Sequence, residues 1–204
     1  GAVIPHLAVD PGSPFFKDRL YVVWSDFRSN RLEILLSYSS DKGRTWSTPV
    51  TISDDRAAAD ALKNGPDNIT PTVAVNKDGV VAVTWHDRRD FADNLGWNVR
   101  FRTSLDGGET WMPSVKVSDK PTAFGGSETW VAAAAGGAAA GRGGRGGADS
   151  ARSGGRVISL SARLSNANFT FAPGHNGAFA ADAAGAFHPM WIDNRTGMYQ
   201  VWTA

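Results

Sequence analysis

Three copies of the pattern Trp-x-Asp-x-Arg, at residues 24–28, 85–89 and 191–195, carry the side chains best suited to chemistry. Each copy follows a short run of β-type residues, and the two-residue period of a strand places its Trp, Asp and Arg on one side. A carboxylate at the end of such a strand can serve as a general acid or base, and Asp26 and Asp87 are the candidates. A planar guanidinium suits a carboxylate or a hydroxylated ligand.

Two interpretations of this pattern remain open. In the structural interpretation, the Asp and the Arg of each copy pair with each other. In the functional interpretation, arginines from several copies converge as a cationic rim for an acidic or hydroxylated ligand. The candidate ligand-binding residues within the pattern are Arg28, Arg89, Asp193 and Arg195.

Three further candidates for ligand binding lie outside the shared pattern. Arg88 occurs only in the second copy, beside a longer loop in which Trp97 is predicted to be an exposed platform for stacking. His175 lies in a Gly-His-Asn-Gly segment. The 4 histidines show no metal-ligand spacing, so we expect neither a metal nor a cofactor. A P-loop, a dinucleotide fingerprint and a Gly-x-Ser-x-Gly elbow are also absent from the sequence.

A second repeated pattern, Ser-x-Asp-x-Gly-x-Thr-Trp, predicts hairpin turns at residues 39–46 and 104–111. The Asp can accept hydrogen bonds from N–H groups of its own turn, and the Gly supplies a positive φ. The closing Trp begins the next strand and is expected to anchor it in the core. We predict a structural role for Ser39, Asp41, Gly43, Thr45, Trp46, Ser104, Asp106, Gly108, Thr110 and Trp111.

Around these patterns the sequence predicts repeated units of four short antiparallel strands. In such a meander the turn between the third and fourth strands lies at one end of the sheet, and the second strand finishes at the other end. The two patterns are therefore expected at opposite ends. The predicted strands are 2–10, 20–26, 33–39 and 46–53, then 70–75, 80–87, 98–104 and 111–118, then 177–183, 186–193 and 198–203, with 157–161 resembling a leftover fourth strand.

An Ala/Gly/Arg tract at residues 132–155 interrupts the repeats. It has no periodicity and no large apolar side chain, so it cannot form a sheet of its own. We interpret it as a flexible insertion or a reading-frame artefact. The alternative is an RGG-like nucleic-acid segment, but such segments interleave aromatic residues, and this tract has none.

The composition excludes several classes of partner. With 21 Lys and Arg against 20 Asp and Glu, the formal charge is +1, and no whole-chain field favours nucleic acid or a membrane surface. Cysteine is absent, which excludes disulfides and thiolate metal sites. No apolar run has the length of a membrane span, and no signal peptide is visible in the sequence.

The two Ser-x-Asp-x-Gly-x-Thr-Trp turns resemble the Asp boxes, or BNR repeats, of the sialidase-like superfamily. The resemblance covers the chain except for the Ala/Gly/Arg tract. It implies an all-β fold, a β-propeller of four-stranded antiparallel blades, six when complete, of which residues 1–204 hold about three and a half as one partial domain. It also implies that the Asp boxes are structural and that the ligand site lies on the opposite face.

The resemblance implies a glycan-binding protein that in its full-length form acts as an exo-glycosidase of the exo-α-sialidase type. The alternative is a non-catalytic propeller that binds carbohydrate or protein. Known sialidases pair a Tyr nucleophile with a Glu, and the sequence shows no such pairing between Tyr21, Tyr38 or Tyr199 and any Glu. A first-strand Arg of that family is also not found. A secreted, periplasmic or cell-surface location goes with this prediction, and the oligomeric state stays open.

Overall fold

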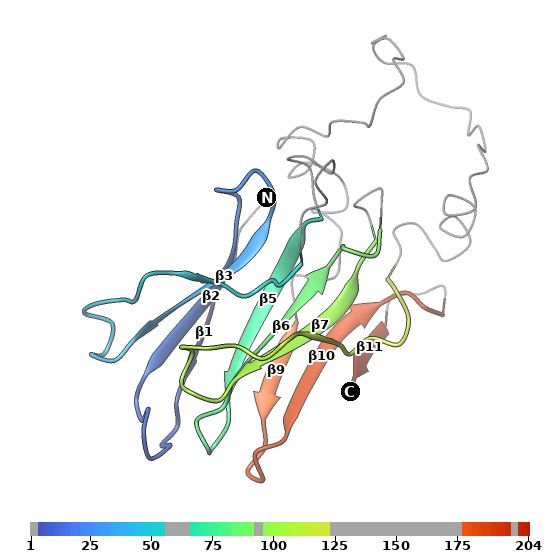
Figure 1. Ribbon diagram of the computed structural model, residues 1–204. Helices are drawn as coiled ribbons and strands as arrows, with labels where there is room; N and C mark the ends of the chain where they lie inside the picture. The colour runs from blue at the N-terminus through green and yellow to red at the C-terminus, as the bar shows by residue number, and fades with distance from the viewer. Residues whose placement is uncertain (1–3, 56–65, 92–95, 123–176, 197–199) are drawn as a thin grey trace, which may run out of the picture.

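The computed structural model describes residues 4–55, 66–91, 96–122, 177–196 and 200–204. These residues form three antiparallel sheets of three or four strands (Figure 1). The described part of the chain contains no helix long and apolar enough to cross a membrane. The tract at 132–155, the predicted strand at 157–161, His175 and Tyr199 lie outside the described residues.

The first two sheets repeat the same simple meander, in which each strand pairs with the next along the chain. The first sheet contains β1 (His6–Val9), β2 (Leu20–Asp26), β3 (Glu33–Ser39) and β4 (Val50–Thr51). The second contains β5 (Asn68–Val75), β6 (Val81–Asp87), β7 (Asn98–Ser104) and β8 (Val115–Lys116). The predicted all-β class and the four-strand units are confirmed here.

The third sheet has three described strands, β9 (Ala178–Ala181), β10 (Phe187–Asp193) and β11 (Gln200–Thr203), with β10 in the middle. The second sheet lies between the first and the third (Figure 1). Its first strand, β5, contacts β1 and β2 on one side and β9 on the other. The three sheets therefore follow one another in space in the order of the sequence.

The fourth strands are much shorter than predicted. Instead of 46–53 and 111–118, only residues 50–51 and 115–116 pair as ladders. Pro49 and Pro113 have no N–H to donate, which interrupts the ladder before each short strand. In the first sheet the Ser47 side chain replaces one of the missing ladder bonds, because Ser47 Oγ accepts a hydrogen bond from the Tyr38 N–H at 3.0 Å.

The main core fills the space between the first and second sheets. Alternate residues of β2 and β3 point toward the second sheet, and alternate residues of β5 and β6 point back. Trp85 is fully buried there, on the side of β6 that faces the first sheet. The buried members are Tyr21, Val23, Ile34, Leu36, Ile52, Val73, Val75, Val81, Val83 and Trp85. The third sheet packs through aromatic rings, with Phe101 on β7 at 5.9–6.0 Å from Phe179 and Phe187.

Candidate functional site

Each Trp-x-Asp-x-Arg segment closes on itself. In the second copy, Asp87 accepts hydrogen bonds from the Trp85 indole at 3.0 Å and from the Arg89 backbone N–H at 2.9 Å. The Arg89 guanidinium also donates hydrogen bonds to Asp87, from Nε to Oδ1 at 2.9 Å and from Nη2 to Oδ2 at 2.8 Å. The same bonds occur in the copies at 24–28 and 191–195. The pairing that the structural interpretation predicts is therefore present in all three copies.

Two of the arginines also reach the sheet that precedes their own. Arg89 Nη2 donates to Asp54 Oδ1 at 2.7 Å, and Arg195 Nη1 pairs with Asp119. Asp54 and Asp119 each follow the fourth strand of the preceding sheet, at repeat-equivalent positions. We call each of these two pairs an inter-sheet clasp. It joins the end of one sheet to the second strand of the next.

Arg28 is the exception, because within the described residues its guanidinium pairs with Asp26 alone. Its side chain is 63% exposed, against 20% for Arg89 and 12% for Arg195. Of the three arginines, Arg28 is therefore the one with donors turned to solvent. Arg89 and Arg195 each hold a carboxylate of the preceding sheet, and a role for the three arginines in ligand binding stays a prediction.

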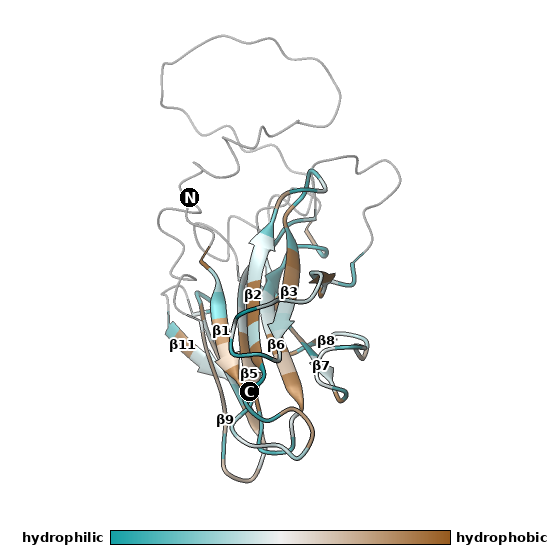
Figure 2. Cartoon of the chain, turned by 90° about the vertical axis from the view of Figure 1, so that its left-hand side faces the viewer, coloured by the Kyte–Doolittle hydropathy of each residue, from teal (hydrophilic) through white to brown (hydrophobic). Residues whose placement is uncertain are grey.

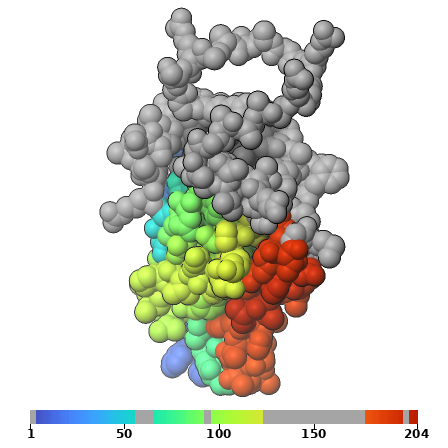
Figure 3. Space-filling view, turned by 90° about the vertical axis from the view of Figure 1, so that its right-hand side faces the viewer, coloured from blue at the N-terminus to red at the C-terminus, as the bar shows by residue number. Residues whose placement is uncertain are grey.

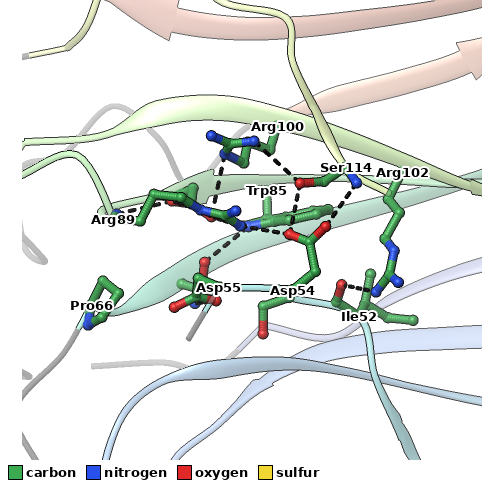
Figure 4. Close-up of polar contacts among 12 residues, drawn as sticks. Ile52, Asp54, Asp55, Pro66, Trp85, Arg89, Arg100, Arg102 and Ser114 are labelled. Atoms are coloured by element: carbon green, nitrogen blue, oxygen red, sulfur yellow. Dashed lines mark hydrogen bonds and ion pairs between the residues drawn. The ribbon is translucent and has the colours of Figure 1, made fainter. Parts of the chain in front are cut away.

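Asp54 is the centre of the first clasp (Figure 4). Besides Arg89, it accepts the Ser114 N–H at 2.8 Å and the Ser114 hydroxyl at 2.7 Å. Burial favours the neutral acid, but these bonds outweigh it and lower the pKa of Asp54. Nearby, Arg102 Nη1 donates to the Ile52 carbonyl at 2.6 Å, a further link between the two sheets.

Asp55, next along the chain, lies in a buried network that sequence reasoning missed and that the Trp85 indole links to Asp87. It pairs with Arg31 and accepts from Asn68 Nδ2 at 2.9 Å, while Asn68 Oδ1 accepts from the Trp85 indole at 2.9 Å. Burial raises the pKa of Asp55, and the charge of Asp87 adds to this, against the effect of Arg31. With a side chain only 2% exposed, Asp55 has no access to a ligand in solution.

The two candidate acids are poorly placed to move protons. Hydrogen bonds from Arg28 hold the pKa of Asp26 well below its usual range, so this carboxyl is ionised at neutral pH. The Asp87 side chain is 1% exposed and is saturated by the bonds described above. Both carboxylates have the geometry of anchors for their arginines. A catalytic role for either one stays a prediction.

Trp97 is not an exposed platform, and that prediction is wrong. The residue is 1% exposed, and its ring stacks on His86 at 5.4 Å between centroids, with 14° between the planes. A β-bridge to Thr122 draws Trp97 inward, and the Arg88 guanidinium lies 5.9 Å from its ring. The Arg88 side chain is thus placed against an internal aromatic pair, and Arg88 itself is buried.

The two Ser-x-Asp turns have the predicted geometry. Asp41 accepts from the Thr45 N–H at 2.8 Å, the Thr45 hydroxyl at 2.6 Å and the Ser39 hydroxyl at 2.8 Å, and Asp106 repeats the set with Thr110 and Ser104. Gly43 and Gly108 have φ of 83° and 98°. The hydrogen bond from Thr45, first among several, lowers the pKa of Asp41 to about 2.

The closing tryptophans differ from each other. Trp111 is partly buried and packs against the core between the first and second sheets. Trp46 is 43% exposed, so the prediction that it anchors the core is wrong. The physical reason is its position: Trp111 packs onto the sheet that precedes its own, and no described sheet precedes the one that contains Trp46.

A Tyr–Glu pair does exist, although the sequence showed none. The Tyr38 hydroxyl donates to Glu109 Oε1 at 2.5 Å, and the Arg19 guanidinium lies 4.3 Å from the Tyr38 ring. The two residues are 71 positions apart, so no local spacing reveals the contact. The pair lies at the Asp-turn end, away from the Trp-x-Asp-x-Arg segments. The bond to Glu109 raises the pKa of Tyr38, which disfavours the nucleophilic phenolate.

Within the described residues, no group of three or more His, Cys, Asp or Glu side chains is arranged to hold a metal ion. The guanidinium groups of the Trp-x-Asp-x-Arg segments are suited to binding anions, and each of them holds at least one carboxylate of the chain itself.

Comparison with known proteins gives similarity in solved structures alone. No protein-family model matches the chain, and no curated protein matches it. A leech intramolecular trans-sialidase, in complex with 2,7-anhydro-Neu5Ac, aligns at 19% identity and a TM-score of 0.38 over 56% of this chain. A Hadza microbial sialidase aligns at 19% identity and a TM-score of 0.43, also over 56%. The aligned part spans 14% and 25% of those two chains, respectively.

Proposed function

We propose that the three sheets are consecutive blades of a sialidase-like β-propeller and that the Trp-x-Asp-x-Arg motif fastens each blade to the one before it. The observation that carries this proposal is the recurrence of the inter-sheet clasp at Arg89 and at Arg195. Four-stranded sheets with two apolar faces need a neighbour on each side, and radial repetition provides it. The adjacent positions of β1, β5 and β9 are consistent with first strands around a common axis.

The proposed ligand of this propeller is a glycan, bound at the Trp-x-Asp-x-Arg end. The support is the resemblance of the two Ser-x-Asp turns to Asp boxes, because in the sialidase-like superfamily the Asp boxes lie opposite the ligand site. Arg28 supplies exposed guanidinium donors there, and such forks suit carboxylate or hydroxyl groups. An exported location goes with a glycan ligand and is part of the same proposal.

For the described residues the proposal is binding without hydrolysis. Asp26 is held ionised by Arg28, Asp87 is enclosed, and the Tyr38–Glu109 pair lies at the other end of the sheets. An exo-glycosidase of the sialidase type would draw its acid and its nucleophile from residues elsewhere. With a fluorogenic sialoside we expect this chain to release no aglycone, and turnover that disappears in a Tyr38→Phe variant contradicts the proposal.

Titration calorimetry tests the ligand directly, with 3'-sialyllactose as the acidic probe and lactose as the neutral one. We expect sialyllactose to bind and Arg28→Gln to weaken it by about tenfold or more, because charge-assisted hydrogen bonds are lost. Arg44→Gln is the matched control, since Arg44 is an exposed arginine in the turn at the opposite end. Absence of binding for both sugars, or equal effects of the two variants, refutes the glycan proposal.

A further inference from the structure

The first strand of the second sheet extends further than its described counterparts in the other two sheets. In the first and third sheets, the ladder between the first two strands stops one residue before the Trp of the Trp-x-Asp-x-Arg motif. In the second sheet the ladder continues past Trp85 to the pair of Asn68 with Asp87, and a β-bulge lies where it passes the Trp. The other two sheets form without this bulge, so the sheet architecture alone does not account for it.

The bulge places Thr70 in a strained conformation. Thr70 and Pro71 together lie opposite the single residue Trp85, and the φ of Thr70 is 54°. A positive φ is unfavourable for a β-branched side chain, and a following proline restricts the backbone further. No other non-glycine residue with positive φ in the described part of the chain is β-branched. Local preference therefore does not explain this conformation.

The residues on either side hold the bulge in place. Asn68 is fully buried, its Nδ2 donates to Asp55 Oδ1 at 2.9 Å, and its Oδ1 accepts from the Trp85 indole at 2.9 Å. On the other side of the bulge, the hydroxyl groups of Thr72 and Thr84 share a buried hydrogen bond of 2.6 Å. A strained backbone persists only where its surroundings fix it in this way. The buried network around Asn68 thus maintains a conformation that the chain would otherwise avoid.

The Thr70 hydroxyl is open to solvent at the Trp-x-Asp-x-Arg end of the sheets. Thr70 is partly exposed, and within the described residues its hydroxyl makes no hydrogen bond and is not one of the buried polar atoms without a partner. Its strand, β5, contacts β1 and β2 on one side, as Figure 2 shows, and β9 on the other. Figure 3 shows the third sheet, in red, directly beside the second, in green. Thr70 therefore lies on the strand that both neighbouring sheets approach.

We propose that Thr70 contacts the glycan directly, by a hydrogen bond between its hydroxyl and a hydroxyl group of the sugar. This inference rests on the proposed glycan function and adds a contact residue at the same end of the sheets. β-Bulges are common beside binding sites, where they turn a side chain toward the ligand, and strained residues cluster at such sites. Whereas Arg28 provides charge, Thr70 provides a neutral group that both donates and accepts.

Titration calorimetry with 3'-sialyllactose and a thermal melt of each variant test this inference together. Thr70→Val keeps the β-branched shape and removes the hydroxyl. We expect its affinity to fall about threefold to tenfold, the effect of one neutral hydrogen bond, at an unchanged melting temperature. Thr70→Gly also removes the hydroxyl, but glycine adopts a positive φ without strain. We expect this variant to bind as weakly as Thr70→Val and to melt at a higher temperature than the wild type.

Thr103→Val is the matched control, because Thr103 is a partly exposed threonine of β7 beside the Asp106 turn, at the opposite end of the sheets. It keeps the wild-type affinity. Wild-type affinity in both Thr70 variants overturns this inference, and if Arg28→Gln still weakens binding, the proposed glycan function stands. A lower melting temperature for Thr70→Gly also overturns the inference, since the conformation is then not strained. A wild-type chain that binds no sugar overturns the proposed function and this inference with it.

Discussion

Arg28 and Arg89 occupy equivalent positions with different numbers of partners, so a matched pair of substitutions isolates the inter-sheet clasp. The Arg89 guanidinium binds Asp87 on its own sheet and Asp54 on the preceding one. Arg28 binds Asp26 alone among the described residues. We expect Arg89→Gln to lower the free energy of unfolding much more than Arg28→Gln does.

The magnitude follows from what each substitution leaves behind. Asp87 is 1% exposed, and removing one partner of a buried ion pair costs about 3–5 kcal/mol. Asp87 keeps its bonds from the Trp85 indole and the backbone N–H at 89, and Asp54 keeps Ser114. These remaining donors bring the expected loss for Arg89→Gln to about 2–3 kcal/mol. In the Arg28 pair the guanidinium is 63% exposed although Asp26 is only 16% exposed, so solvent screening reduces the cost of Arg28→Gln.

Urea unfolding followed by tryptophan fluorescence measures the free energy of unfolding of both variants and the wild type. In a parallel thermal melt, a loss of about 2–3 kcal/mol in a chain of this length corresponds to a fall of roughly 4–12 °C in the melting temperature. Equal losses for the two variants, or a larger loss for Arg28→Gln, refute the idea that the second carboxylate makes the difference. A double-mutant cycle with Asp54→Asn then assigns the coupling to the Arg89–Asp54 pair.

Three further outcomes follow from the turns. Asp106→Ala removes the acceptor of three hydrogen bonds and is expected to cost about 1 kcal/mol in a thermal melt, whereas an unchanged melt contradicts its structural role. The pKa values of Asp41 and Asp106 are lowered to about 2, below the unfolded value near 4, so both carboxylates stabilise the fold above about pH 5. We expect that stability to be lost as the pH falls from about 4 to 2, and melting temperatures that stay flat over this range contradict it. Gly79→Ala should lower the free energy of unfolding by about 1 kcal/mol more than Gly185→Ala does. Both glycines have positive φ, but only at Gly79 would a new Cβ lie 2.7 Å from the Ser13 hydroxyl. Equal losses of stability for the two variants contradict this.

The parts of the fold that the sequence predicts are those fixed by contacts between near neighbours in the chain. In the two turns, the hydrogen bonds from Thr45 to Asp41 and from Thr110 to Asp106 each join residues within a stretch of five. The pairing of Asp87 with Arg89 lies within a stretch of three, so the spacing in the sequence reveals these contacts. Alternation of apolar residues likewise predicts β2, β3, β6, β7 and β10 close to their observed bounds.

Contacts between sheets could not be predicted in this way. The Asp54–Arg89 clasp joins residues 35 positions apart, and Tyr38 and Glu109 are farther apart still. The exposure of Trp46 depends on whether a sheet precedes its own, which the repeat pattern does not state. A signal for the clasp was nevertheless present, because the Ser-Asp step that ends each fourth strand recurs at Asp54 and Asp119.

The clasps have a consequence for how such a chain can change in length during evolution. The middle unit carries one half of two different clasps: Arg89 for the unit before it and Asp119 for the unit after it. Duplicating a whole unit therefore copies a donor and an acceptor together, and every new junction finds its partner. Deleting a whole unit brings the acceptor of one survivor to the donor of the next. The number of units can thus change in whole repeats while each clasp keeps both its carboxylate and its guanidinium.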